Sequence, residues 1–144
     1  MKTKSNKYQK KLTVKSTTDN LSRIRDFIKL SADKSGLNTD VICKIILAVD
    51  EACTNIIKHS YNYLPEGKII INVKADNSKF EVSITDDGKK FNPDEVEDPD
   101  LKKYYKEKKV GGLGMFLMKK LMDDVKYYKL AENRNKVVLV KYIN

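Results

Sequence analysis

Three polar residues spaced four apart, Glu51, Asn55 and His59, lie in the segment LAVDEACTNIIKHSY, residues 47–61. At 3.6 residues per turn they form a ladder along one side of a helix. Hydrophobic residues fall in the adjacent sector, so the ladder borders the predicted core. A carboxylate, an amide and an imidazole in that place predict the lining of a pocket. The alternative is a capped helix whose border residues are merely polar.

A second candidate site follows a predicted strand, where residues 84–91 read ITDDGKKF. Asp86 and Gly88 stand where that strand ends. The carboxylate can accept a hydrogen bond from an amine on a flat heterocycle, and the glycine lets such a ring approach the backbone. The alternative for Asp86 is a residue that only forms the turn.

A third candidate is the glycine cluster VGGLGM, in which Gly111, Gly112 and Gly114 precede a predicted helix. Such a turn offers free N–H groups and a positive dipole end to phosphate. The cluster lacks the Walker A spacing, and no strand precedes it as in a Rossmann fingerprint. Residues 92–110, acidic and then basic, separate it from the second site. An irregular segment of this length predicts a lid over a nucleotide, or else a solvated insertion.

The composition narrows the possible partners. The 144 residues carry a net charge of +9, which fits one domain with a polyanionic partner such as nucleotide phosphates. Arginine clusters with interleaved aromatic residues are missing, so we expect no direct contact with nucleic acid. No apolar run is long enough for a membrane span, and the basic amino-terminal segment lacks the apolar core of a secretory signal.

The counts of cysteine and histidine exclude other chemistry. Cys43 and Cys53 would lie about 15 Å apart along one helix, too far for a disulfide between them. Reduced thiols suit a cytoplasmic protein. With one histidine and two separated cysteines in the sequence, no zinc site of the usual ligands is expected.

The elements that position these residues are expected in the order β α α β β, loop, α β β. We predict strands at 10–15, 68–75, 79–85, 125–130 and 137–143, and helices at about 18–35, 40–61 and 113–122. The apolar stripe of the second helix would comprise Ile42, Ile45, Ile46, Val49, Ala52, Cys53, Ile56 and Ile57. These patterns predict a single domain over 1–144, a two-layer α/β (α+β) sandwich whose mixed, mostly antiparallel sheet has helices on one face.

The three candidate sites together resemble a known superfamily. Glu51 and Asn55 on a helix, Asp86 and Gly88 after a strand, and GLG opening a helix resemble the N, G1 and G2 boxes of the Bergerat-fold (GHKL) ATPases. The runs DEACTNIIKHSY, TDDGKKFNP and GGLGMFLMKKLMDDV look most like the bacterial anti-sigma-factor serine/threonine-protein kinases, the RsbW and SpoIIAB group. The resemblance covers nearly the whole chain.

This resemblance implies a Bergerat-type fold that binds ATP and Mg²⁺. Asn55 would coordinate Mg²⁺ through its side-chain oxygen, a ligand that suits this hard cation. Glu51 would be the general base for the attacking hydroxyl. Asp86 would accept a hydrogen bond from the adenine amino group, with Gly88 beneath the ring. His59 is assigned no catalytic role, because a hydrogen-bonded histidine at a helix border explains it.

The glycine cluster would complete the site implied by the resemblance. Gly111, Gly112, Leu113 and Gly114 would bind the cofactor by letting the helix N-terminus close on the phosphates. Residues 92–110 would be the ATP lid.

The resemblance also implies a partner-switching mechanism in the cytoplasm. The protein would form a homodimer, bind a sigma factor, and phosphorylate a serine or threonine of a STAS-type anti-sigma antagonist. One alternative is a non-catalytic, ATP-dependent module that sequesters a regulatory partner, which would not need Glu51. Another is a histidine-kinase catalytic domain, but that requires a phosphoacceptor histidine on a helix pair, whereas the one histidine here is His59. A charge-driven nucleic-acid binder would show salt-sensitive binding.

Overall fold

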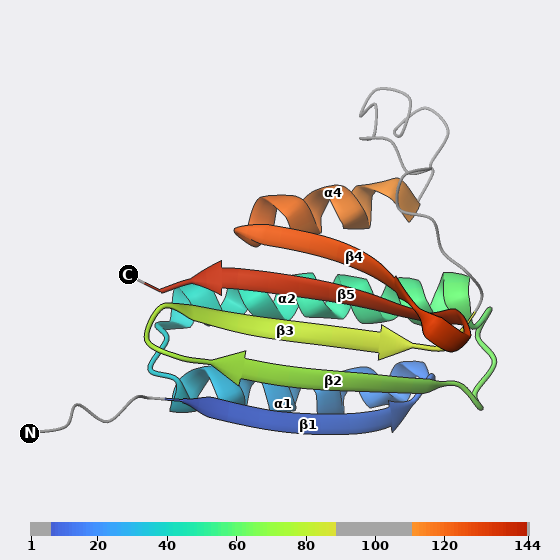
Figure 1. The fold of residues 1–144 in the computed structure, drawn as a ribbon, viewed down its shortest axis with the longest axis horizontal. Helices are drawn as coiled ribbons and strands as arrows, with labels where there is room; N and C mark the ends of the chain where they lie inside the picture. The colour runs from blue at the N-terminus through green and yellow to red at the C-terminus, as the bar shows by residue number, and fades with distance from the viewer. Residues whose placement is uncertain (1–6, 89–110, 144) are drawn as a thin grey trace, which may run out of the picture.

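The computed structural model describes residues 7–88 and 111–143, so the predicted lid, 92–110, lies outside the described residues. Five strands form one sheet in the order β1-β2-β3-β5-β4, and α1 and α2 cover one face of it (Figure 1). The elements are β1 (Tyr8–Lys15), η1 (Thr18–Asn20), α1 (Leu21–Lys34), α2 (Thr39–Asn55), η2 (Ile56–Ser60), β2 (Lys68–Ala75), β3 (Lys79–Asp86), α4 (Gly111–Leu121), β4 (Asp124–Leu130), η4 (Ala131–Asn133) and β5 (Arg134–Tyr142). The predicted two-layer α/β sandwich is confirmed.

The sheet differs from the prediction in one respect, since every pairing between the described strands is antiparallel rather than mixed. Strands β3 and β4 run in the same direction, but β5 lies between them and pairs with both. The β4–β5 hairpin therefore places its second strand next to β3, so β3 and β4 do not pair with each other.

The core lies between the helices and the inner face of the sheet. Alternate residues of β2 and β3 are buried, as their period-2 pattern predicts: Ile69, Ile71, Val73, Phe80, Val82 and Ile84. The stripe of α2 is buried as well, except Ile46, which is half-buried at the edge of the core. Asn38 caps α2, because its side-chain oxygen accepts a hydrogen bond from the Val41 N–H at 2.9 Å.

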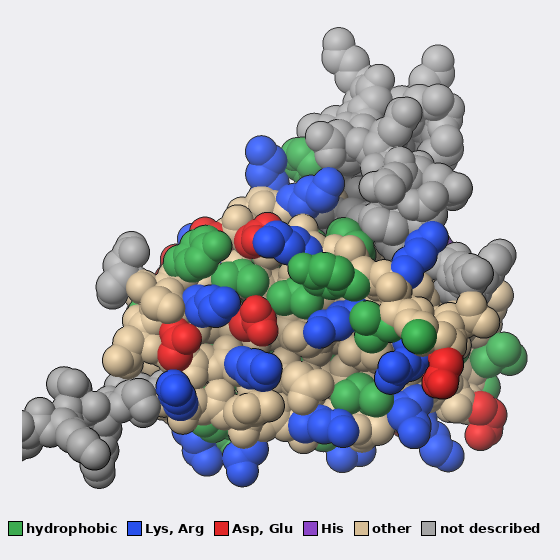
Figure 2. Space-filling view, viewed as in Figure 1, with side chains coloured by type: hydrophobic (Ala, Val, Ile, Leu, Met, Phe, Trp, Pro, Cys, Tyr) green, Lys and Arg blue, Asp and Glu red, His purple; other side chains and the backbone are tan. Residues whose placement is uncertain are grey.

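No helix among residues 7–88 and 111–143 covers the other face of the sheet. Figure 2 shows this face with many Lys and Arg side chains, a few acidic ones and several hydrophobic side chains among them. Lys11, Lys74 and Lys136 are among the residues that alternation places on this side, together with the exposed Tyr128 and Tyr142. In the part of the chain that the structure describes, no helix is both long and apolar enough to cross a membrane.

Candidate functional site

The fold brings the three predicted segments to one end of the molecule. Glu51 and Asn55 lie half-buried in the last two turns of α2, and Asp86 ends β3. Helix α4 begins at Gly111 and packs against α2. In Figure 1 the C-terminal ends of α2 and β3 and the N-terminal end of α4 all lie at the right of the view.

Asp86 is a buried carboxylate that is held in place by hydrogen bonds. Its Oδ1 accepts from the Gly88 N–H at 3.0 Å and from Asn135 Nδ2 at 3.2 Å. Burial raises the pKa of Asp86, and hydrogen bonds from Asn135, Gly88 and the Ser60 side chain oppose that rise. Its negative charge also helps burial to raise the pKa of the Cys53 thiol on α2. The result is a fixed hydrogen-bond acceptor facing the second helix.

Gly88 lies directly on the end of the helix that carries the ladder. A Cβ built on it would stand 2.7 Å from the Ser60 carbonyl oxygen and 2.8 Å from Ser60 Cβ. Real Cβ contacts are essentially never this short, so only glycine permits the approach. This contact with Ser60 explains why a glycine is needed at position 88, which the sequence alone did not show. It also joins the turn after β3 to the helix.

The helix end itself departs from the prediction of one α-helix to Tyr61. After Asn55 it continues as the π-helix η2, in which the Tyr61 N–H donates to the Ile56 carbonyl at 3.0 Å, five residues back. The wider turn leaves His59 exposed and puts Ser60 against Asp86 and Gly88. Single π-turns of this kind are frequent at functional sites.

Sequence reasoning missed two partners of Asp86. One is Ser60, because helical spacing of four pointed to His59 instead. The other is Asn135, which is the register partner of Asp86 across β3 and β5. Strand pairing between distant segments carries no local signal, so nothing in the sequence around Asn135 indicated that it would lie beside Asp86.

The glycine cluster is placed differently from the prediction of a turn before a helix at Leu113. The helix begins at Gly111, so the backbone of residues 111–114 forms its first turn. Buried Met118 and Met122 anchor the later part of this segment in the core, and such packing outweighs the low helix propensity of glycine. First-turn N–H groups lack partners within a helix, so they remain suited to an anion.

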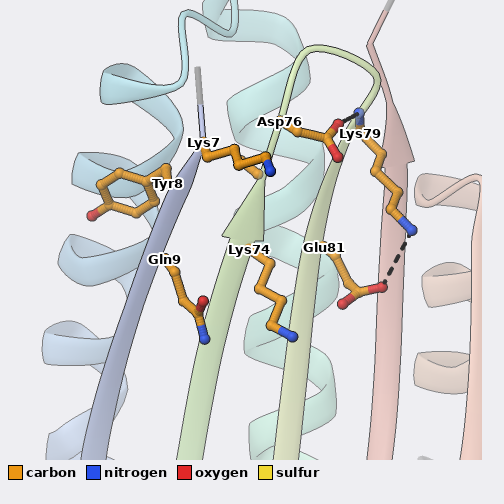
Figure 3. Close-up of a pocket in the computed structure, with 8 residues that line it drawn as sticks. Lys7, Tyr8, Gln9, Lys74, Asp76, Lys79 and Glu81 are labelled. Atoms are coloured by element: carbon orange, nitrogen blue, oxygen red, sulfur yellow. Dashed lines mark hydrogen bonds and ion pairs between the residues drawn. The ribbon is translucent and has the colours of Figure 1, made fainter. Parts of the chain in front are cut away.

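A separate surface hollow lies at the other end of the sheet (Figure 3). Its lining consists of Lys7, Tyr8, Gln9, Lys74, Ala75, Asp76, Lys79 and Glu81. Asp76 Oδ1 accepts from the Lys79 N–H at 3.0 Å, and Lys79 Nζ lies 3.8 Å from Glu81 Oε1. Hydrogen bonds from Ser78 and Lys79 lower the pKa of Asp76. The carboxylates therefore stabilise the β2–β3 turn and the strand surface, and the described residues that line this hollow include none of the predicted site residues.

The donor atoms near the ladder fit a magnesium ion that arrives with a nucleotide. Over residues 7–88 and 111–143 no group of three or more His, Cys, Asp or Glu side chains is placed to hold a metal. Mg²⁺ in nucleotide sites usually takes one or two protein oxygens and completes its shell with phosphate and water. Asn55, half-buried at the end of α2, offers one amide oxygen of the required kind.

Comparison with known proteins identifies the class of this fold and site. Residues 14–141 match the histidine kinase-like ATPase domain family, so the chain belongs to that family and ATP is the ligand that the family implies. The crystal structure of the RsbU and RsbW domains of a Mycobacterium tuberculosis protein has the same fold, with a TM-score of 0.66 at 14% identity. The match covers 93% of this chain and 32% of that one.

Closer relatives place the chain within the family. It is 34% identical over 117 residues to the serine-protein kinase RsbW of Listeria monocytogenes serovar 1/2a, covering 78% of this chain and 73% of that protein. It is 33% identical over 120 residues to the serine-protein kinase RsbW of Bacillus subtilis strain 168, covering 78% and 72%. The chain belongs to the RsbW serine-protein kinases, which confirms the predicted resemblance and the prediction of a protein-serine kinase.

Proposed function

We propose that this chain is an ATP-dependent serine/threonine protein kinase that acts as an anti-sigma factor in a partner-switching system. Its substrate would be a STAS-type anti-sigma antagonist. The observation that carries the proposal is the joining of the helix with Glu51 and Asn55 to the turn with Asp86 and Gly88, through Ser60. A nucleotide spanning that junction would have its base at one side and its phosphates at the other.

Each side of the junction offers the groups that such a nucleotide needs. On the strand side, Asp86 would accept a hydrogen bond from the adenine amino group, with Gly88 beneath the ring. On the helix side, Asn55 would hold Mg²⁺, which neutralises phosphate charge when it is bound. The first-turn N–H groups of α4, from Gly111, Gly112, Leu113 and Gly114, would bind the phosphate oxygens.

Glu51 supplies the chemical group that separates a kinase from a binding module. It lies one turn before Asn55 on the same side of α2. In the proposed reaction the substrate hydroxyl oxygen forms a bond to the γ-phosphorus, and the bond from that phosphorus to the β–γ bridging oxygen breaks. The hydroxyl proton passes to Glu51, and ADP leaves.

The proposed partners follow from the family rather than from the geometry of the site. The protein would hold a sigma factor away from RNA polymerase, act as a homodimer and work in the cytoplasm. Phosphorylation of the antagonist would decide which partner is bound.

The test uses the purified chain, Mg²⁺, [γ-³²P]ATP and a STAS-domain protein from the same genome. We expect label on a serine or threonine of the STAS protein. Glu51→Gln should lower the rate by about 10²–10⁴ while leaving the Kd for ATP unchanged. The matched control is Glu66→Gln, which makes the same change at an exposed glutamate between η2 and β2.

Two results would contradict the proposal. If Glu51→Gln transferred phosphate at the wild-type rate, Glu51 would not be the general base. ATP binding by the wild type without any transfer would favour the non-catalytic module that sequesters its partner.

A further inference from the structure

The hydroxyl group of Tyr61 lies between β2 and β3, just beyond the point where these strands stop pairing. Its oxygen is 2.7 Å from the Lys68 carbonyl oxygen and 2.6 Å from Asp87 Oδ1. It also accepts from the Asp87 N–H at 3.0 Å and from the Lys68 N–H at 3.3 Å. A phenol has one proton, so it donates to one of the two acceptors at a time while its lone pairs take both N–H groups.

The strand register shows what this hydroxyl replaces. The last pair of the β2–β3 ladder is Ile69 with Asp86, so the next pair in register would be Lys68 with Asp87. Three of the backbone groups of that pair bond to the Tyr61 oxygen instead of to each other. The Tyr61 hydroxyl therefore takes the place of one backbone pair and separates the two strands at the residue after Asp86.

The aromatic ring that carries this hydroxyl has little freedom to move. Tyr61 is buried, and a Cβ built on Gly67 would lie 2.5 Å from the ring atoms Cδ1 and Cε1. The backbone of Gly67 thus lies directly on the ring, and its carbonyl oxygen accepts from the Ser16 N–H at 2.9 Å. Burial, followed by the hydrogen bond to Asp87, raises the pKa of Tyr61, so the phenol keeps the proton that it donates.

We propose that Tyr61 is a positioning residue for nucleotide recognition, and that it fixes the turn of residues 86–88 to the end of the helix that carries Glu51 and Asn55. This inference rests on the proposed role of Asp86 as the acceptor for the adenine amino group. Tyr61 follows η2 directly, so one side chain connects the helix end to the residue between Asp86 and Gly88. Loss of its hydroxyl would free that turn without removing any group that touches the nucleotide.

The test compares two nucleotides that differ only in the group that Asp86 recognises. Titration calorimetry gives the Kd for ATP and for purine riboside triphosphate, which lacks the 6-amino group. Wild type should prefer ATP. Tyr61→Phe should reduce this preference about 5- to 10-fold, the size expected when one or two hydrogen bonds no longer hold the acceptor. Tyr63→Phe, which alters a 60% exposed ring two residues away, should keep the preference.

A general loss of stability would weaken the binding of both nucleotides equally. The ratio of the two Kd values therefore separates an effect on positioning from an effect on folding. Circular dichroism confirms that each variant is folded at the assay temperature. If Tyr61→Phe does not fold, Asp87→Ala removes only the carboxylate partner of the hydroxyl and should reduce the ratio about 2- to 3-fold. An unchanged ratio in a folded Tyr61→Phe, or in Asp87→Ala where that variant is needed, overturns the inference. A wild type that binds both nucleotides equally, or neither, overturns the proposed role of Asp86 instead.

Discussion

Replacing Gly88 by alanine tests whether the junction of helix and strand creates the nucleotide site. The new Cβ would lie 2.7 Å from the Ser60 carbonyl oxygen, whereas ordinary contact begins at 3.4 Å. The two backbones must therefore separate by about 0.7 Å, because neither neighbour is the mobile end of a flexible side chain. Overpacking of this kind costs roughly 1–3 kcal/mol. The displaced turn carries Asp86, so we expect the Kd for ATP to rise at least about tenfold.

The same substitution at Gly36 is the control. Gly36 follows α1 at the far end of the molecule with φ +80°, and a Cβ added to it would have nothing within 4 Å. Alanine at this position adds backbone strain of about 1–2 kcal/mol to the folded state. The lower entropy of the unfolded chain offsets roughly 0.4–1 kcal/mol of that loss in the free energy of unfolding. Gly36→Ala should therefore lower the stability modestly and leave the Kd for ATP unchanged.

Thermal unfolding and calorimetry are measured on both variants. For a chain of this size about 1 kcal/mol corresponds to roughly 3–5 °C in Tm. If folded Gly88→Ala binds ATP as tightly as wild type, the contact with Ser60 does not position the acceptor, and our account of the site is wrong. Equal losses of affinity in both variants would show that general stability, not the junction, governs binding.

Three further predictions concern the same end of the molecule. Asn55→Ala should make ATP binding insensitive to Mg²⁺, which calorimetry with and without the ion would show, and a retained Mg²⁺ dependence would place the ligand elsewhere. Ser60→Val should weaken ATP binding while His59→Ala should not. The reverse result in the same assay would show that His59, as the i, i+4 spacing suggested, and not Ser60 lines the site. Because the pKa of Asp86 is raised, this carboxyl group keeps its proton to higher pH in the folded state than in the unfolded state. Its contribution to stability is therefore lost as the pH rises above the ordinary carboxyl pKa of about 3.9. Asp86→Asn should remove this contribution to the pH dependence of the unfolding free energy above the ordinary carboxyl pKa, and an unchanged pH profile would contradict it.

Much of the secondary structure follows from local pattern. The bounds of β2, Lys68–Ala75, agree with the predicted strand because its hydrophobic residues alternate between two clear turn signals. The order of strands could not be obtained in that way. Whether β4 or β5 lies next to β3 depends on contacts between residues about fifty positions apart, and no local spacing records that choice.

The candidate site was predictable where one residue type at one spacing suffices. Glu51 and Asn55 are four apart on a helix, and Asp86 stands where an alternating strand stops. The contacts that join these pieces were not predictable, because they depend on a π-turn in the helix. An extra residue per turn leaves no mark in the i, i+4 pattern, so the sequence pointed to His59 where the structure places Ser60.

That π-turn has a consequence for how the site would respond to change. Asn55 begins the turn and Tyr61 ends it, so the residues assigned to the metal and to the strand junction are separated by one short rigid element. Ser60 and Tyr61 both contact the segment that follows β3. A shift of this helix end would therefore move the metal ligand and the base acceptor together rather than one against the other. The spacing between base and phosphate would then be set by this one element, against which the backbone of Gly88 lies directly at Ser60.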